Sequence, residues 1–357
     1  MTTLSEKPSA PSTRQVSKRV SQSVFDGSRL RVVLLVDVHD GAQQQFLEAY
    51  EQLCNQVAQV PGHVSDQLCQ SIENPSQWLI TSEWESAPPF LTWVNSEEHV
   101  RMVEPLHSCV RDTRSLRFHV VRETGGAAAR SAERRRLQSS PRIGDGVIRH
   151  ALTFTVRPGS EAEVKRILAD YASPRARVDE TTRLCRTSLF MHGNRVVRAI
   201  EVRGDLLAAL RHVARQPEVR AVEEAINPYL EQERDLNDQE SARVFFTRAA
   251  LPAVHHVTAD ELTEGERLAR YYPARPGSGM RLAELLAQRD EAAADDPDGP
   301  VLRSTIFQRD DVVVRLLDVR PGHGAPPESG HLAGLEALLD GEPVGMDLVT
   351  DRRSPDA

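Results

Sequence analysis

Apolar and polar positions follow the same pattern twice along the chain. Residues 184–202 and residues 301–319 each contain two apolar runs rich in β-branched side chains, separated by a polar turn. The turn is His192-Gly193-Asn194 in the first stretch and Arg309-Asp310-Asp311 in the second. This pattern predicts a β-hairpin in each stretch.

The two hairpins belong to a longer duplicated unit. Phe190 corresponds to Phe307 at an offset of 117 positions, and Arg186 then corresponds to Arg303. Upstream, the Arg-Pro-Gly-Ser sequence of residues 157–160 recurs at residues 275–278, at an offset of 118. Two blocks in the same order and at nearly the same spacing indicate an internal repeat.

The region before the repeat, residues 30–121, is predicted to form a separate unit. Its apolar positions alternate where strands are expected and recur every three to four residues where helices are expected. The predicted order is β-α-β-β-α-β, which is typical of a ferredoxin-like unit. The elements are a strand over 30–38, a helix with its buried stripe at Phe46, Tyr50, Leu53 and Val57, strands over 64–72 and 78–84, a helical region over 89–110 and a strand over 116–121.

The two copies of the repeat predict the same order of elements, and the second copy is degenerate. The fold class is therefore α+β, with three ferredoxin-like units. In the first copy we expect a strand over 147–156, a helix carrying Val164 and Leu168, the hairpin, helices from about Leu206 and Val219, and a strand over 244–247. In the second, from about residue 267 to 352, we expect a short helix over 332–339 and a last strand over 346–350.

Composition limits the class of protein. The 357 residues are 39% hydrophobic, with no apolar run of membrane-spanning length, and the formal charge of −8 argues against nucleic-acid binding. Four cysteines without metal-type spacing and a polar N-terminus favour a cytoplasmic protein. We divide the chain into a disordered tail (1–27), a first domain (28–123), a flexible linker (124–146), a second domain (147–256) and its degenerate repeat (257–357).

Arg198 is the first candidate for chemistry. It lies on the same face of its predicted strand as Val196, Ile200 and Val202, and an arginine on an aliphatic face is costly to bury without an anionic partner. Two interpretations follow: a buried ion pair with a nearby acid, or a guanidinium that projects into a cavity and holds an anionic ligand oxygen. Under the second, Arg198→Ala impairs binding more than folding.

Histidines and tryptophans supply the other candidates. His63, His99 and His107 are candidate bases in the first unit, and His119 is a candidate for lining its sheet. Trp78 and Trp84 share a strand face about 20 Å apart, and we expect Trp84 to line a pocket. In the second unit, acid–base chemistry would fall to His150 or His192. His255 and His256 are assigned to a connector and not to a metal site.

Residues 30–123 resemble the antibiotic biosynthesis monooxygenase family. The resemblance rests on the strand end Glu83-Trp84-Glu85-Ser86 and on Phe90, Trp93 and the segment Ser96-Glu97-Glu98-His99 that follow it. Some quinone-forming members carry an asparagine four residues before the strand-end tryptophan, where this chain has Ile80.

Residues 147–251 resemble the small tetracenomycin-type aromatic polyketide cyclases. The matching segments are Phe190, Ile200-Glu201, Gln216-Pro217, Asn227-Pro228-Tyr229-Leu230 and Val244-Phe245-Phe246. In those cyclases the position of Arg198 is a catalytic histidine. Arginine stays protonated and is not a base, but it can stabilise an enolate or phenolate. The whole arrangement resembles the SchA/CurD-like proteins of aromatic polyketide clusters, often for spore pigments, and implies units of the dimeric α+β barrel type.

These resemblances imply a cofactor-independent, quinone-forming monooxygenase with an associated cyclase, acting on a polycyclic aromatic polyketide with molecular oxygen as co-substrate and no metal. We expect a homodimer through residues 30–123, possible contact with other polyketide cyclases, and no nucleic-acid or membrane partner. The alternatives are a cyclase only, or a non-catalytic scaffold of a polyketide synthase complex. The candidate catalytic residues are His63, Trp84, His99 and Arg198; the candidate substrate-binding residues are Trp78, Trp93, His107, His119, His150, Arg186 and His192.

Overall fold

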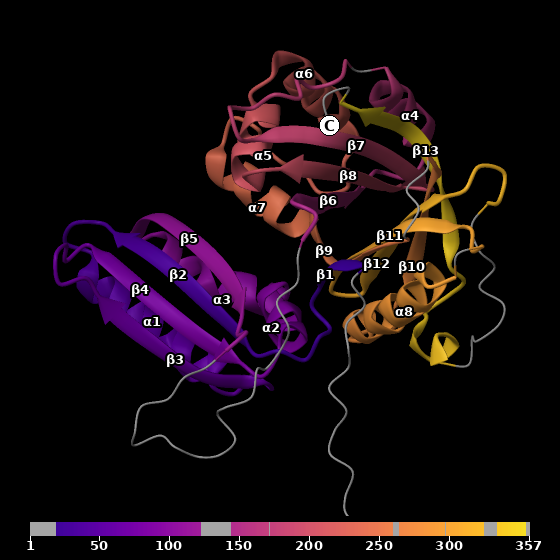
Figure 1. Ribbon diagram of the computed structural model, residues 1–357. Coiled ribbons are helices and arrows are strands. Elements are labelled where there is room, and N and C mark those ends of the chain that lie inside the picture. Colours follow the sequence, from indigo (N-terminus) through magenta and orange to yellow (C-terminus); the bar gives the residue numbers. More distant parts are fainter. Residues whose placement is uncertain are drawn as a thin grey trace, which may run out of the picture.

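A computed structural model describes residues 19–122, 144–170, 172–259, 264–296, 298–324 and 334–354. The chain folds into two bodies, each built on its own sheet (Figure 1). The predicted tail up to residue 18 and most of the predicted linker lie outside the described residues. Among the described helices, none is both long and apolar enough to cross a membrane.

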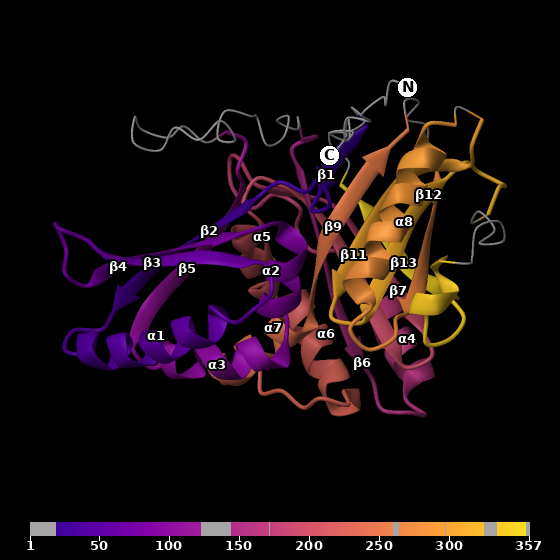
Figure 2. The same cartoon turned by 90° about the horizontal axis from the view of Figure 1, so that it is seen from below.

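The first unit has the predicted ferredoxin-like order. Its antiparallel sheet has the strand order β3-β4-β2-β5, and Figure 2 shows α1 and α3 on one side of it. The predicted helical region over 89–110 is two helices, separated where Ser96 caps the second one by accepting a hydrogen bond from the backbone N–H of His99. The elements are β2 (Leu30–Val38), α1 (Gln43–Val57), β3 (His63–Gln70), β4 (Gln77–Trp84), α2 (Ala87–Val94), α3 (Glu97–His107) and β5 (Val110–His119).

The second and third units repeat that strand order. In both, the first and third strands of the unit are adjacent, with the second and fourth strands at the edges. The second unit contains β6 (Val147–Thr155), α4 (Glu161–Ala169), β7 (Arg183–His192), β8 (Arg195–Arg203), α5 (Leu206–Ala214), α6 (Pro217–Ile226), α7 (Gln239–Ala249) and β9 (Ala250–Thr258). The third contains β10 (Glu266–Pro273), α8 (Gly279–Ala294), β11 (Val301–Arg309), β12 (Val312–Val319), a short 3-10 helix (Glu336–Leu338) and β13 (Val344–Arg353).

These two units close into a ring of eight strands. The last strand of each unit pairs with the second strand of the other, β9 with β11 and β13 with β7, and β9 also pairs with β6. Alternate side chains from all eight strands fill the interior of the ring, where Phe190, Leu251 and Phe307 are fully buried. Helices cover the outside, with α8 lying along β11 and β12 (Figure 2).

Three local predictions are wrong. Residues 244–247 belong to α7 and not to a strand. The strand that completes the second unit is β9, so His255 and His256 lie on a strand and not, as predicted, in a connector. Phe245 and Ala249 are four positions apart and pack into the same core, so the apolar run there has helical spacing. Residues 20–23, predicted to be part of a disordered tail, form β1 (Val20–Ser23) and pair with β9.

Arg198 is held by an ion pair. Its face of β8 points away from the ring interior toward the helices, and its Nη1 donates to Oε1 of Glu223 on α6 at 2.5 Å. Arg234 donates to the other oxygen of the same carboxylate at 2.7 Å. In the repeat, Arg315 pairs with the fully buried Asp290 of α8. The structure therefore contradicts the prediction that Arg198 projects into a ligand cavity.

Replacing Glu223 with glutamine is expected to destabilise the fold strongly. The change removes the carboxylate that the buried Arg234 and the part-buried Arg198 share, which costs about 3 kcal/mol or more. The free energy of unfolding in urea measures this. Glu224→Gln is the matched control, because Glu224 pairs with Arg220 on the exposed side of α6 and its loss should cost less than about 1 kcal/mol. Equal losses would contradict the assignment.

Candidate functional site

The first unit encloses a cavity of about 270 Å³ between its sheet and its helices. Most of its wall is aliphatic or aromatic, so the cavity can take up a flat apolar molecule and exclude water from it. Thr113, Ser115 and Arg117 on β5 line the cavity and are also exposed, so the cavity opens along this strand. The apolar lining residues are Val32, Leu34, Val36, Phe46, Leu53, Val57, Ile80, Phe90, Val94, Val103, Leu106 and Val110.

His99 is a candidate proton acceptor in this wall. It lies in the first turn of α3, and its ring meets the ring of Trp93 edge-on, with 4.5 Å between centroids. Burial, then the charges of His107 and Arg117, lower the pKa of His99 to about 4. The imidazole is therefore neutral at neutral pH and has a free site for a proton.

Arg117 supplies positive charge at the opening. Its guanidinium carbon lies 5.3 Å from the centroid of the Phe90 ring, which forms part of the same wall. It is also close enough to His99 to lower the pKa of that imidazole. An anion formed on a bound ring would be stabilised by this guanidinium.

A second polar group, formed by Tyr50, Asp66 and His63, lies on the α1 side of the cavity. Tyr50 and Asp66 line the wall, and His63 Nε2 lies 2.8 Å from Asp66 Oδ2 behind it. Burial, then the charge of Asp66, raises the pKa of Tyr50 to about 12. His63 itself is not part of the lining, and it contacts the wall residue Asp66 from behind.

The tryptophans divide between wall and support. Trp93, a candidate substrate-binding residue, lines the cavity, whereas Trp84 is fully buried behind it and does not. Trp84 stacks on Trp93 with 5.4 Å between centroids and donates from Nε1 to Ser82 Oγ at 2.7 Å. Trp78 is also absent from the lining and packs on Phe46 at 5.4 Å. The prediction that Trp84 lines the pocket is wrong, since it supports Trp93 from behind the wall.

Of the other histidines of the first unit, only His107 lines the cavity. Its Nδ1 lies 3.0 Å from Nη2 of Arg243 on α7, so a residue of the second unit orients it. His119 is exposed at the end of β5, 3.6 Å from Asp26, and lies outside the lining.

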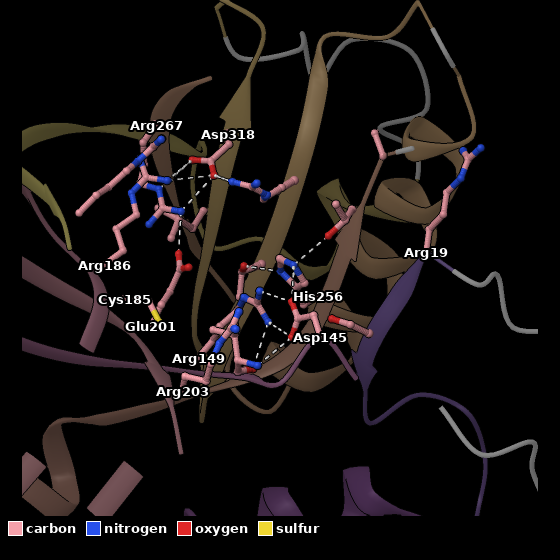
Figure 3. Close-up of a pocket in the computed structure, with 18 of the residues that line it drawn as sticks. Arg19, Asp145, Arg149, Cys185, Arg186, Glu201, Arg203, His256, Arg267 and Asp318 are labelled. Atoms are coloured by element: carbon pink, nitrogen blue, oxygen red, sulfur yellow. Dashed lines mark hydrogen bonds and ion pairs between the residues drawn. The ribbon is translucent and has the colours of Figure 1, made fainter. Parts of the chain in front are cut away.

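The candidates of the second unit do not converge. His150 lies on β6, and burial, then the charge of Arg117, lowers its pKa to about 4. His192 is exposed at the end of β7. Arg186 lines a different cavity, of about 610 Å³, at one end of the ring (Figure 3). None of these three side chains lines the cavity of the first unit.

Sequence reasoning missed Asp66, Tyr50 and Arg117 as site residues. The signal for Asp66 was its position on the same face of β3 as Leu68, where an acid is out of place on an apolar face. Tyr50 was assigned only to a buried helix stripe. Within the ranges described above, no group of three histidine, cysteine or acidic side chains is arranged to hold a metal ion.

Comparison with known proteins gives two family matches. Residues 29–105 match the family described as antibiotic biosynthesis monooxygenase, and residues 147–259 match the SchA/CurD-like domain. Among solved structures, the chain is similar to SnoaB, a cofactor-independent oxygenase from Streptomyces nogalater. The two are 18% identical over 27% of this chain and 96% of SnoaB, with a TM-score of 0.26.

Three curated relatives from Streptomyces match nearly the whole chain. A 42.8 kDa protein of the whiE locus of Streptomyces coelicolor is 65% identical over 92% of this chain and 84% of its own length. SchA of Streptomyces halstedii is 59% identical over 95% of this chain and 92% of SchA. The polyketide synthase CurD of Streptomyces cyaneus is 58% identical over 95% and 98%. At this identity and coverage, the chain belongs to the SchA/CurD family.

Proposed function

We propose that the first unit is a cofactor-independent monooxygenase that converts a polycyclic aromatic phenol of polyketide origin into a quinone. The observation that carries this proposal is the pairing of a neutral His99 with the positive Arg117 in an apolar cavity. The family match of residues 29–105 and the name of the relative CurD support the reaction class and the substrate class.

For this reaction the protein needs only to transfer a proton, orient the substrate and exclude water from it. His99 takes a proton from the bound anthrone-like ring, and Arg117 stabilises the resulting anion. The electron-rich anion passes an electron to molecular oxygen, and the two radicals combine into a peroxide at the ring carbon. His99 returns its proton as the peroxide breaks down, so a CH₂ group and O₂ become a carbonyl group and water.

The ring of the second and third units favours a different role. Its middle is filled by side chains such as Phe190 and Phe307, and Arg198 is already held by Glu223. These contacts favour the scaffold alternative for this part of the chain over a cyclase that uses Arg198. In this proposal the ring positions residues that complete the first unit, among them Arg243 beside His107.

Replacing His99 with alanine in the full-length protein is expected to lower kcat for oxygen consumption by about 100-fold or more, because a positioned base contributes at least that factor. An oxygen electrode with 1,8-dihydroxyanthrone as substrate measures the rate, after subtraction of spontaneous oxidation. His119→Ala is the control, since His119 is exposed and outside the lining. A His99→Ala protein that keeps the wild-type rate would refute this assignment.

The same rate should be level through the neutral pH range and fall only as the pH drops through about 4, where His99 becomes protonated. The sign follows from the lowered pKa, because the base form persists at lower pH than in a free histidine. Stopped assays at each pH, with circular dichroism to confirm folding, give the profile. An inflection near 6.5, the ordinary value, would show that His99 is not the base.

We also propose that the first unit forms a homodimer through the sheet face opposite its helices. Leu35 on β2 and Phe118 on β5 are 43% and 51% exposed on this face. Apolar groups of this size on an otherwise uncovered sheet face indicate an interaction surface. Light scattering should give twice the chain mass for the wild type and one chain mass for Phe118→Glu. Leu207→Glu is the matched control, because Leu207 is equally exposed on α5; a monomeric wild type would end the proposal.

A further inference from the structure

One end of the eight-stranded ring holds a strong concentration of positive charge. The cavity there, of about 610 Å³, shares no lining residue with that of the first unit, and Figure 3 shows residues that line it. Among the described residues, seven arginines and three acids line it, although the whole chain carries a formal charge of −8. The arginines are Arg19, Arg149, Arg186, Arg203, Arg267, Arg303 and Arg353; the acids are Asp145, Glu201 and Asp318.

The internal repeat builds this end of the ring twice. Arg186 of β7 corresponds to Arg303 of β11, and Ser188 corresponds to Thr305, both at the offset of 117. Glu201 and Asp318 are related in the same way, and both accept hydrogen bonds from Arg267. The two halves can therefore be compared group by group.

In the half around Arg186 the charge is balanced. Arg186 donates to both oxygens of Asp351, from Nε at 2.8 Å and from Nη2 at 2.5 Å. Ser188 Oγ donates to the same carboxylate at 2.8 Å. Asp351 comes from β13, where it lies directly opposite Ser188. A guanidinium, a hydroxyl and a carboxylate thus form one complete set of contacts.

In the other half the carboxylate is missing. The strand position opposite Thr305 is held by His256 of β9, so His256 stands where Asp351 stands in the first half. His256 Nδ1 and Thr305 Oγ1 are 2.8 Å apart, which preserves the contact to the hydroxyl. Burial, then the charge of Arg149, holds the pKa of His256 well below its usual value, so the ring is neutral.

Arg303 consequently has weaker contacts to acidic side chains than its counterpart Arg186. Its contact to Asp318 is long, at 3.3 Å, and Asp318 also accepts from Arg186 and Arg267. The Arg303 side chain is 33% exposed, against 5% for Arg186. The nearby Asp145 is bonded to Arg149, so it balances that arginine and not Arg303.

We propose that this half of the ring end binds the carboxylate group of a small organic acid. Arg303 is the main partner of that carboxylate, which lies next to the side chain of His256. The bound carboxylate supplies the negative charge that Asp351 supplies to Arg186 in the other half. A carboxylate fits better than a phosphate because Arg186, the counterpart of Arg303 in the other half, already holds a carboxylate through two hydrogen bonds. This site does not depend on the function proposed for the first unit.

Calorimetric titration of the full-length protein with succinate, at an ionic strength held constant with chloride, tests the proposal. We expect saturable binding by the wild type and about tenfold or greater loss of affinity in Arg303→Gln, since a charge-assisted contact is removed. Arg353→Gln is the matched control: it removes a positive charge from the same cavity, on the Asp351 side of the ring. It should change the affinity less than threefold.

A second pair of variants tests the position of His256. His256→Asp supplies the missing carboxylate within the chain and should abolish succinate binding. His256→Asn removes the imidazole without adding charge and should weaken binding less than His256→Asp does. Thermal melting of each variant shows whether it is folded. If the His256→Asp protein is not folded, the comparison of Arg303→Gln with Arg353→Gln still tests the proposal.

Four results would overturn the proposal. They are no saturable binding of succinate, equal losses in Arg303→Gln and Arg353→Gln, unchanged binding in a folded His256→Asp protein, or tighter binding of inorganic phosphate than of succinate. The second result would mean general attraction by the positive field, and the fourth would assign the site to a different class of anion.

Discussion

The pairing of sheet edges is the constraint on which this structure depends. A four-stranded ferredoxin-like sheet leaves unpaired N–H and C=O groups on both outer strands, and such edges bind other strands. The duplication solves this within the chain, because β9 pairs with β11 and β13 pairs with β7. Closing the ring places alternate side chains inside it, buries the aromatic ones at mid-height and collects the charged ones at one end.

The buried arginines follow from the same closure. Each strand of the ring has one face inside and one under the helices, so a charged side chain must find its partner on the face where it lies. Arg198 and Arg315 face the helices and are paired with Glu223 and Asp290. Arg186, on the inner face, pairs with two acids contributed by the third unit. Fold specificity in this part of the chain thus depends on charge pairs as well as on apolar packing.

Much of the fold could be predicted from local patterns, and much of the site could not. The hairpins and the order of units followed from periodicity and from the offset of 117. Residues 244–247 were misassigned because a short apolar run has no decisive period, and packing of Phe245 against the sheet made it helical. Ring closure and the partner of Arg198 depend on residues far apart in sequence. The candidates His99 and Trp93 line the cavity, but Trp84 could not be distinguished from them, because burial behind the wall depends on contacts that the sequence does not show.

Residues of the second and third units complete the surroundings of the cavity in the first unit. Arg243 of α7 touches His107, and Arg309 of β11 donates to the backbone oxygen of Asn95 and contributes to the lowered pKa of His99. β1, which precedes the first unit, is paired with β9 of the ring. A protein cut after residue 122 would keep the apolar hollow but lose the neighbours that tune its proton affinity and the strand partner that anchors its start. Under the proposed function the first unit therefore depends on the rest of the chain, and moving it alone into another protein would transfer its shape without the neighbours that lower the pKa of His99.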